Sequence, residues 1–237
     1  MASRSLQAER TALIVGASRG LGLALAEEFL ARAWSVIGTV REGKRTPLHE
    51  LADQSGGKLR IEAVDINDLS QVERLKAHLP GQFLDLLFVN AGTANANAMR
   101  ANISDVSTEE FVDVLVTNAL SPMRIVDQLA DRVRLGGTIG VMSSGQGSIA
   151  DNERGGNYVY RASKAALNMM MKSFAARTGN DYSLLLLAPG WVQTDLGGPS
   201  APFTIEQVVP ALVDTIVAQE GKRGLQYLDR FGKTVRW

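Results

Sequence analysis

Two side chains that could share acid–base chemistry, Tyr160 and Lys164, stand four residues apart. The surrounding stretch, Asn157 to about Ala176, has a helical pattern, and this spacing puts both side chains on one helix face with their Cβ atoms roughly 5–6 Å apart. A tyrosine ordinarily has a pKa of about 10. A cation about 4 Å away, at an effective dielectric constant near 20, contributes about 4 kcal/mol and could bring that pKa to about 7. The pair therefore predicts a tyrosine that exchanges protons near neutral pH.

A glycine-rich turn near the start of the chain predicts a phosphate site. The apolar run Thr11–Val15 is typical of a buried parallel strand, Leu23–Ala33 is typical of a helix, and the turn Gly16–Gly22 lies between them. The backbone N–H groups of such a turn, together with the helix N-terminus, bind phosphate. Its glycines permit a tight turn and the close approach of a pyrophosphate. The spacing G-x-x-x-G-x-G is not the commoner G-x-G-x-x-G, so the turn alone is a weak signal.

The composition restricts the class of protein. The chain has 237 residues of which 45% are apolar, which suits one α/β domain over residues 1–237. The 25 basic and 25 acidic side chains cancel, so charge favours neither nucleic acid nor an anionic membrane as a partner. With no cysteine and two histidines, we expect no metal site and no Ser-His-Asp hydrolase centre. Met1–Arg10 lacks an apolar signal core and no long apolar run occurs, so we expect a cytoplasmic protein.

Strand-like and helix-like segments alternate along the chain. This alternation predicts right-handed βαβ units and a parallel sheet of about seven strands with helices on both faces, which is one doubly wound Rossmann-type domain. Further helices are expected over Leu69–Leu79, after an N-cap at Thr108, and over Thr204–Gln219. The expected strands are Thr11–Val15, Trp34–Val40, Leu59–Val64, Leu84–Val89, Gly137–Ser143, Tyr182–Ala188 and Leu225–Leu228.

Polar or glycine-rich residues follow most of the expected strands. In doubly wound folds, ligands bind beyond the carboxyl ends of the strands, so these residues should meet along one edge of the sheet. Their joint placement carries more weight than any single motif. They are Gly16–Gly22, Arg41, Asp65, Asn90-Ala91-Gly92, Ser143-Ser144 and Pro189-Gly190.

Together with Asn118, these residues resemble the short-chain dehydrogenase/reductase family. The segments Pro189–Asp195 and Leu225–Trp237 are similar to its carbonyl-reductase and C-factor-like branch. The matching elements run in the family's order and cover nearly the whole chain: Gly16–Gly22, Asp65-Ile66, Asn90-Ala91-Gly92, Asn118, Ser144, Tyr160-x-x-x-Lys164 and Pro189-Gly190-Trp191-Val192-x-Thr194.

The gap between the serine and the tyrosine is longer than the family usually has. Tyr160 lies sixteen residues after Ser144, and the intervening Asp151–Gly156 has the composition of an inserted surface loop. The longer gap leaves Ser143 and Ser148 as rivals of Ser144.

The resemblance assigns roles to four catalytic candidates. Tyr160 would protonate a carbonyl oxygen while hydride arrives at the carbon. Ser144 would donate a hydrogen bond to the same oxygen and orient it, where a preorganised donor matters more than basicity. The resemblance further implies that Lys164 binds the ribose hydroxyls of the cofactor. It also implies that Asn118 holds a water that links Lys164 to bulk solvent.

The choice of cofactor follows from charge at the end of the second strand. NAD-dependent proteins usually place an acid about 20 residues past the glycine turn, where it accepts from the ribose 2′-OH. Here that position is near Val40 and Arg41. Arg41 and Arg19 could bind a 2′-phosphate in bidentate fashion, so we predict NADP(H). NAD(H) stays possible, since Glu42 could take the acid's role if the strand ran one or two residues longer.

The resemblance implies the remaining cofactor contacts. Asp65 would accept from the adenine amino group with Ile66 packed nearby, and the Asn90-Ala91-Gly92 backbone would let the adenine ribose approach. Val192 and Thr194 would meet the nicotinamide carboxamide. The full set of candidate cofactor residues is Gly16, Ser18, Arg19, Gly20, Leu21, Gly22, Arg41, Asp65, Ile66, Asn90, Ala91, Gly92, Tyr160, Lys164, Pro189, Gly190, Val192 and Thr194.

The resulting hypothesis is an NADPH-dependent reductase of a small aldehyde or ketone. The same site could oxidise an alcohol, and a non-catalytic NADP(H)-binding sensor or signalling protein is a third reading of these residues. We expect the segments Gln146–Asn157 and Trp191–Phe203 to shape the substrate pocket, the second as a mobile lid. The family's habit of pairing the Tyr/Lys helix between subunits implies a homodimer or homotetramer.

Overall fold

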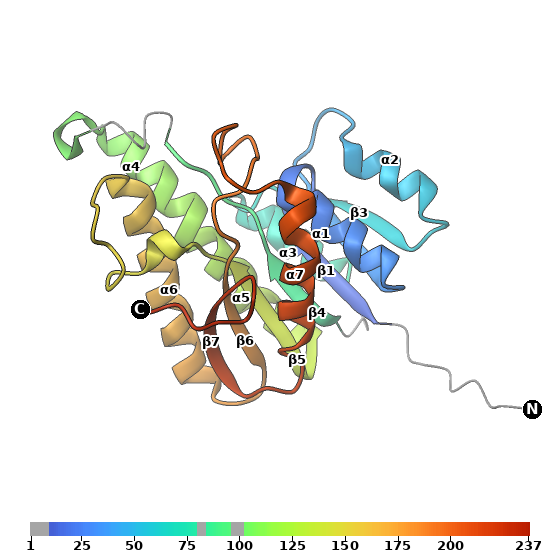
Figure 1. The fold of residues 1–237 in the computed structure, drawn as a ribbon. Helices are drawn as coiled ribbons and strands as arrows, with labels where there is room; N and C mark the ends of the chain where they lie inside the picture. Colours follow the sequence, from blue (N-terminus) through green and yellow to red (C-terminus); the bar gives the residue numbers. More distant parts are fainter. Residues whose placement is uncertain (1–9, 80–83, 96–101) are drawn as a thin grey trace, which may run out of the picture.

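A computed structural model of the chain describes residues 10–79, 84–95 and 102–237. Met1–Arg10, the polar segment at the start, lies outside these ranges except for Arg10. The centre of the molecule is a seven-stranded parallel sheet of order β3-β2-β1-β4-β5-β6-β7 (Figure 1). Its strands are β1 (Thr11–Val15), β2 (Ser35–Val40), β3 (Leu59–Ala63), β4 (Leu84–Val89), β5 (Val133–Met142), β6 (Ser183–Ala188) and β7 (Gly224–Asp229).

Helices cover both faces of this sheet (Figure 1). A π-helical turn, Val116–Leu120, joins the fourth and fifth helices, and a short 3₁₀ turn, Gly145–Gly147, follows β5. The α-helices are α1 (Gly20–Ala31), α2 (Pro47–Gln54), α3 (Leu69–Ala77), α4 (Thr108–Leu115), α5 (Ser121–Leu129), α6 (Tyr158–Thr178) and α7 (Ile205–Val217).

Alternate residues of the strands supply two apolar cores. Ile14 of β1 packs into the cluster that α1 and α7 complete, with Phe29 and Leu212 fully buried there. Leu13 of the same strand packs into the cluster on the other face, where α3, α5 and α6 contribute residues such as Leu167. Because side chains of a strand alternate between its faces, a sheet covered on both faces needs apolar residues throughout, and β6 is buried along its whole length.

The order of the strands fixes where a ligand can bind. The chain runs outward from β1 to β3, returns to β4 beside β1, and then continues in the opposite direction to β7. Val15 pairs with Val89, Val89 with Val141, and Met142 with Leu187. The residues that follow β1, β4, β5 and β6 therefore emerge side by side at one edge, around the point where strand order reverses.

The predicted α/β architecture and the seven parallel strands are confirmed, with differences at the ends of elements. The N-cap of α4 is Ser107 and not the predicted Thr108, because the Ser107 hydroxyl accepts from the Glu110 N–H at 3.1 Å. The fifth strand begins at Val133, before the predicted Gly137, and its pairing with β4 shifts register near Leu84. The short helices α2 and α5 were not predicted.

Two further properties of the described ranges bear on function. No helix in them is long and apolar enough to cross a bilayer. Nor do they contain a group of three or more His, Cys, Asp or Glu side chains arranged to hold a metal ion.

Candidate active site

Tyr160 and Lys164 lie one turn apart near the start of α6, as their spacing predicts. The Lys164 Nζ is 5.8 Å from the centroid of the Tyr160 ring. The lysine is 4% exposed, and its ammonium donates to the Met142 carbonyl at the end of β5 at 2.9 Å. The helix takes this orientation because its apolar stripe, which includes Val159 and Leu167, faces the core. The Tyr160 phenol and the Lys164 ammonium thus both lie at the edge formed by the carboxyl ends of the strands.

Ser144 follows β5 and lies against the tyrosine. Its hydroxyl is within hydrogen-bonding reach of the Tyr160 phenol, and it also accepts from the Gln146 N–H at 3.1 Å. The two rival serines have other partners. The buried Ser143 hydroxyl donates to Asn168 Oδ1 at 2.6 Å, and the Ser148 hydroxyl accepts from the Asp151 N–H at 3.0 Å. The geometry therefore favours Ser144 over both.

Burial changes the ionisation of both catalytic candidates. It raises the pKa of Tyr160 above its ordinary value, and the contact with Ser144 opposes this rise only in part. It lowers the pKa of Lys164 to about 8. The sequence-based expectation of a Tyr160 pKa near 7 is therefore wrong for this structure, because the spacing reveals a nearby cation but does not reveal how far the phenol is removed from water.

Asn118 is fully buried within the π-helical turn, next to the lysine. Its Oδ1 accepts from the Thr93 N–H at 2.7 Å, and its Nδ2 donates to the Thr93 carbonyl and to the Ser163 hydroxyl. The side chain is thus engaged, so the predicted water would have to bind the main-chain carbonyl of Asn118. Pro122, four residues on, has no N–H to offer that carbonyl in an α-helix. No sequence motif predicts Thr93 and Ser163 as partners of Asn118, whereas Pro122 can be seen in the sequence as a break in the helical hydrogen bonding.

The glycine turn is closely packed, and two of its glycines leave no room for a side chain. Gly16 has φ +84°, and a Cβ there would lie 2.8 Å from Ala91. A Cβ at Gly22 would lie 2.0 Å from the Gly16 carbonyl, which also accepts from Asn90 Nδ2 at 2.9 Å. Arg19, the N-cap of α1, makes no side-chain cap. The first N–H groups of the helix are therefore available to an anionic ligand, so the residues fit a dinucleotide phosphate.

The two arginines predicted to bind a 2′-phosphate have different surroundings. Arg41 is exposed directly after β2, which ends at Val40 and does not continue to Glu42. The condition under which Glu42 would take the NAD-type role is therefore not met. The Arg19 guanidinium lies 2.6 Å from the Asp195 carboxylate, and both side chains are exposed.

The residues predicted to meet adenine and its ribose lie beyond β3 and β4. Asp65 Oδ1 accepts from the Asn67 N–H at 2.9 Å, so this carboxylate caps its own turn. Ile66 is 7% exposed and belongs to the core. Gly92 lies close to the catalytic pair, since a Cβ there would be 3.5 Å from Lys164 Nζ. The Asn90 side chain, as described above, holds the glycine turn.

The segment after β6 folds over toward the glycine turn. A Cβ at Gly20 would lie 3.8 Å from the Thr194 methyl group. The Thr194 hydroxyl accepts from the Gly197 N–H at 3.0 Å, and the Gln193 N–H donates to the Phe203 carbonyl at 2.8 Å. Within this loop Val192 is buried, while Pro189 and Gly190 form its start, where Gly190 has φ +90°. The predicted lid is thus internally hydrogen-bonded.

Comparison with known proteins agrees with these motifs. Residues 10–203 match the family model described as short chain dehydrogenase. The chain belongs to the short-chain dehydrogenase/reductase family. It is an oxidoreductase of the carbonyl-reductase and C-factor-like branch. Its similarity to the C-signal protein of Myxococcus xanthus is 32% identity over 157 residues, covering 65% of this chain and 93% of that protein.

Among the solved structures that are similar over nearly the entire chain are two that contain NADP. A short-chain dehydrogenase/reductase from Burkholderia multivorans with bound NADP has a TM-score of 0.94 and 55% identity, covering 97% of this chain and 100% of its own. A carbonyl reductase from Pseudomonas aeruginosa PAO1 in complex with NADP has a TM-score of 0.89 and 35% identity, with coverage of 97% and 100%.

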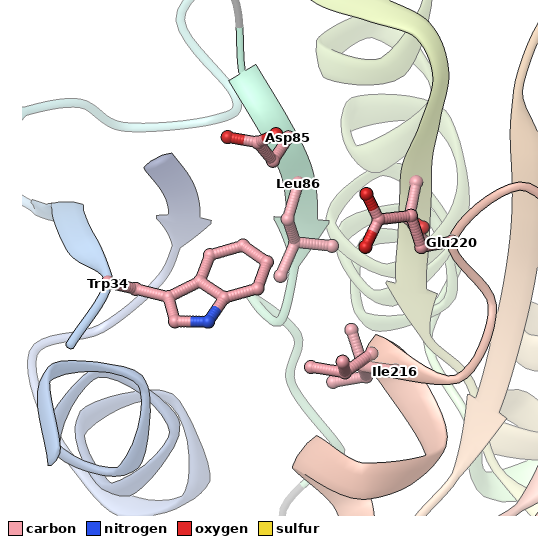
Figure 2. A pocket seen from close by; sticks show the side chains of 7 residues that line it. Trp34, Asp85, Leu86, Ile216 and Glu220 are labelled. Atoms are coloured by element: carbon pink, nitrogen blue, oxygen red, sulfur yellow. The ribbon is translucent and has the colours of Figure 1, made fainter. Parts of the chain in front are cut away.

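A small cavity at the opposite edge of the sheet has no part in this site (Figure 2). Figure 2 shows Trp34, Leu86 and Ile216 around it, with Asp85 and Glu220 at its rim. Its volume is about 10 Å³, which is room for about one water molecule. It lies where β2 and β4 begin, so it is remote from the carboxyl ends that carry the catalytic candidates.

Proposed function

We propose that this short-chain dehydrogenase/reductase uses NADPH to reduce the carbonyl of a small aldehyde or ketone, with Tyr160 as proton donor. The observation that carries the proposal is the meeting of three side chains beside the glycine turn: the Ser144 hydroxyl against the Tyr160 phenol, and the Lys164 ammonium one helical turn away. A phenol with a raised pKa keeps its proton at neutral pH, which suits a general acid.

The division of labour among these residues follows from their chemistry. A bound nicotinamide cofactor supplies the hydride. Ser144 orients the substrate oxygen, and Tyr160 donates the proton that this oxygen needs as the carbonyl becomes an alcohol. Lys164 is cationic at neutral pH and favours the phenolate left behind. The main chain of Asn118 would hold the water through which Lys164 regains contact with solvent.

The preference for NADPH rests on charge and on the relatives. Arg41 takes the position after β2 where an NAD-dependent protein usually has an acid, and Arg19 stands in the glycine turn. The Burkholderia multivorans and Pseudomonas aeruginosa structures described above both contain NADP, which supports the same cofactor here. NAD(H) would still bind, since the turn and the ribose contacts serve either dinucleotide. It would bind more weakly, because it lacks the 2′-phosphate that the arginines would contact.

The decisive experiment follows NADPH and NADH oxidation over a panel of small aldehydes and ketones. We expect Tyr160→Phe to lower kcat by at least about 100-fold, the scale of general acid catalysis. NADPH affinity, measured by fluorescence titration, should stay within about threefold. The matched control is Tyr158→Phe. Tyr158 lies two residues earlier on the same helix, and the residue four positions after it is Ala162 and not a lysine.

The outcomes separate the alternatives. Equal rates for wild type and Tyr160→Phe would refute the proposed proton donor. Turnover of an alcohol panel with NADP, with no carbonyl reduced, would favour the oxidative direction. Tight NADPH binding without turnover of any substrate would favour a sensor or signalling protein.

Two expectations about the whole protein accompany this proposal. A homodimer or homotetramer stays a prediction, which light scattering of the purified protein would check. The cytoplasmic location is likewise a prediction, and cell fractionation would test it.

A further inference from the structure

Tyr227 of β7 makes a contact with the candidate active site that no motif predicts. The phenol is 2% exposed and donates to the backbone carbonyl of Ser144. The same carbonyl accepts from the Gly147 N–H at 2.8 Å. Both lone pairs of the Ser144 carbonyl are therefore used, one by the serine's own loop and one by a strand 83 residues further along the chain.

The C-terminal residues pack against Tyr227. Residues 233–237, called the strap below, run beside β7, where the Val235 N–H donates to the Tyr227 carbonyl at 2.9 Å. The Trp237 ring packs against the Tyr227 ring with centroids 5.4 Å apart. In Figure 1 this end of the chain, marked C, lies next to α6 and β7. The strap thus contacts both the backbone and the ring of Tyr227.

The strap also holds the far end of the serine loop, residues 144–151. The Ala150 N–H donates to the Trp237 carbonyl at 2.9 Å. Arg236 Nε donates to the Asp151 carboxylate at 2.6 Å. Hydrogen bonds therefore hold this loop at both ends: Tyr227 binds it at Ser144, and the strap binds it at Ala150–Asp151.

On its other side the serine loop packs tightly against α6. A Cβ at Gly147 would lie 2.9 Å from Asn168 Nδ2 and 3.0 Å from the Lys164 main chain. Asn168 Nδ2 also donates to the Gly147 carbonyl at 3.3 Å. The loop is therefore fixed between the helix that carries the catalytic pair and the strand that carries Tyr227.

We propose that Tyr227, supported by Trp237, is a positioning residue that sets the Ser144 hydroxyl against Tyr160. This inference rests on the proposed function of Ser144. Losing the phenol oxygen would leave a carbonyl without one of its two donors and free the loop at its first residue. Because a displacement of about 1 Å in a reacting constellation can cost about 100-fold in rate, a loosened serine lowers turnover without touching the cofactor.

The first test is Tyr227→Phe, which removes the hydroxyl and keeps the buried ring. We expect kcat for carbonyl reduction to fall about tenfold while the Kd for NADPH stays within about twofold. The matched control is Tyr182→Phe, since Tyr182 is a partly buried tyrosine just before β6, at the opposite edge of the sheet. Equal kcat for Tyr227→Phe and wild type would overturn the proposal.

A double-mutant cycle separates positioning from general stability. In a Ser144→Ala background, Tyr227→Phe should lower kcat by less than about twofold, because the group it positions is already gone. A loss as large as in the wild-type background would mean that Tyr227 acts elsewhere, and the proposal would fail.

Amide hydrogen exchange gives a readout that does not need a substrate. In Tyr227→Phe and in Trp237→Ala, exchange should rise at the N–H groups of Gln146 and Gly147 and stay unchanged in β1. If wild type reduces no carbonyl, the proposed function fails. The exchange pattern would still support the conclusion that Tyr227 and Trp237 hold the serine loop in place. Unchanged exchange at these amides in both variants would overturn it.

Discussion

At the scale of single residues, the fold acts on the ionisation of the two catalytic candidates, Lys164 and Tyr160. Burial lowers the pKa of Lys164 to about 8, and its ammonium donates to the Met142 carbonyl. Tyr160 moves the other way, since burial raises its pKa. At neutral pH the enzyme therefore presents a protonated phenol beside a cation, which suits the proton donation that we propose for Tyr160.

The pH dependence of reduction should report the lysine. With saturating NADPH, we expect kcat to be level below pH 8 and to fall as the pH rises through about 8, because Lys164 then loses its proton and its charge. The phenol is still protonated in that range. The measurement is a pH–rate profile of wild type and of Lys164→Arg, whose guanidinium stays charged. A profile that stays level to pH 10 in wild type would contradict this assignment.

At the scale of elements, the glycine turn and α1 show how closely backbone segments must approach. Gly22 packs directly on the Gly16 carbonyl and the Asn90 amide, so a side chain there forces the turn apart. Asn90 joins the end of β4 to the same turn. The proposed phosphate site is thus one structure made from the ends of two strands and the start of a helix.

Replacing Gly22 by alanine should therefore impair cofactor binding more than any local change in helix propensity would suggest. We expect the Kd for NADPH to rise at least about tenfold, because the added Cβ would lie 2.0 Å from the Gly16 carbonyl. The matched control is Gly145→Ala, where no atom lies within 4 Å of the added Cβ. Fluorescence titration of both variants makes the comparison, and equal affinities would show that the turn adapts.

Apolar runs were enough to predict the centre of the sheet, because strands β1, β4 and β6 are almost entirely buried and have nearly continuous apolar sequences. The edge strands β3 and β7 are only partly buried. Two kinds of feature could not be predicted from these apolar runs. The eight-residue α2 has too few turns for periodicity to show, although Pro47 and the Thr46 cap mark its start. The contact between Tyr227 and Ser144 depends on the pairing of distant strands, and the pKa of Tyr160 depends on burial; neither is encoded in local spacing.

At the scale of the whole molecule, one sheet separates two apolar cores, and every strand contributes to the pairing. Helices α1 and α7, distant in sequence, pack together on one face. We therefore propose that residues 1–237 form one domain, as the sequence predicts.

This proposal predicts a single cooperative unfolding transition. The three tryptophans report different regions, since Trp34 lies in one core, Trp191 in the lid and Trp237 in the strap. In urea, tryptophan fluorescence and far-UV circular dichroism should give the same midpoint. The control is the same titration with saturating NADPH, which should move both midpoints upward together. Two separated midpoints would indicate more than one folding unit.

The ion pair between Arg19 and Asp195 bears on how well the protein can tell one dinucleotide from another. A 2′-phosphate that takes Arg19 must replace a carboxylate already 2.6 Å from that guanidinium. Selectivity is a difference between two affinities, so only the excess of phosphate over carboxylate contributes to it. Exposed pairs of this kind are worth about 0–1 kcal/mol, which corresponds to at most about fivefold in affinity. Asp195 therefore lowers the proposed contribution of Arg19 to NADP(H) selectivity by no more than that factor, and a 2′-phosphate bound to Arg19 would release the Asp195 carboxylate from the pair.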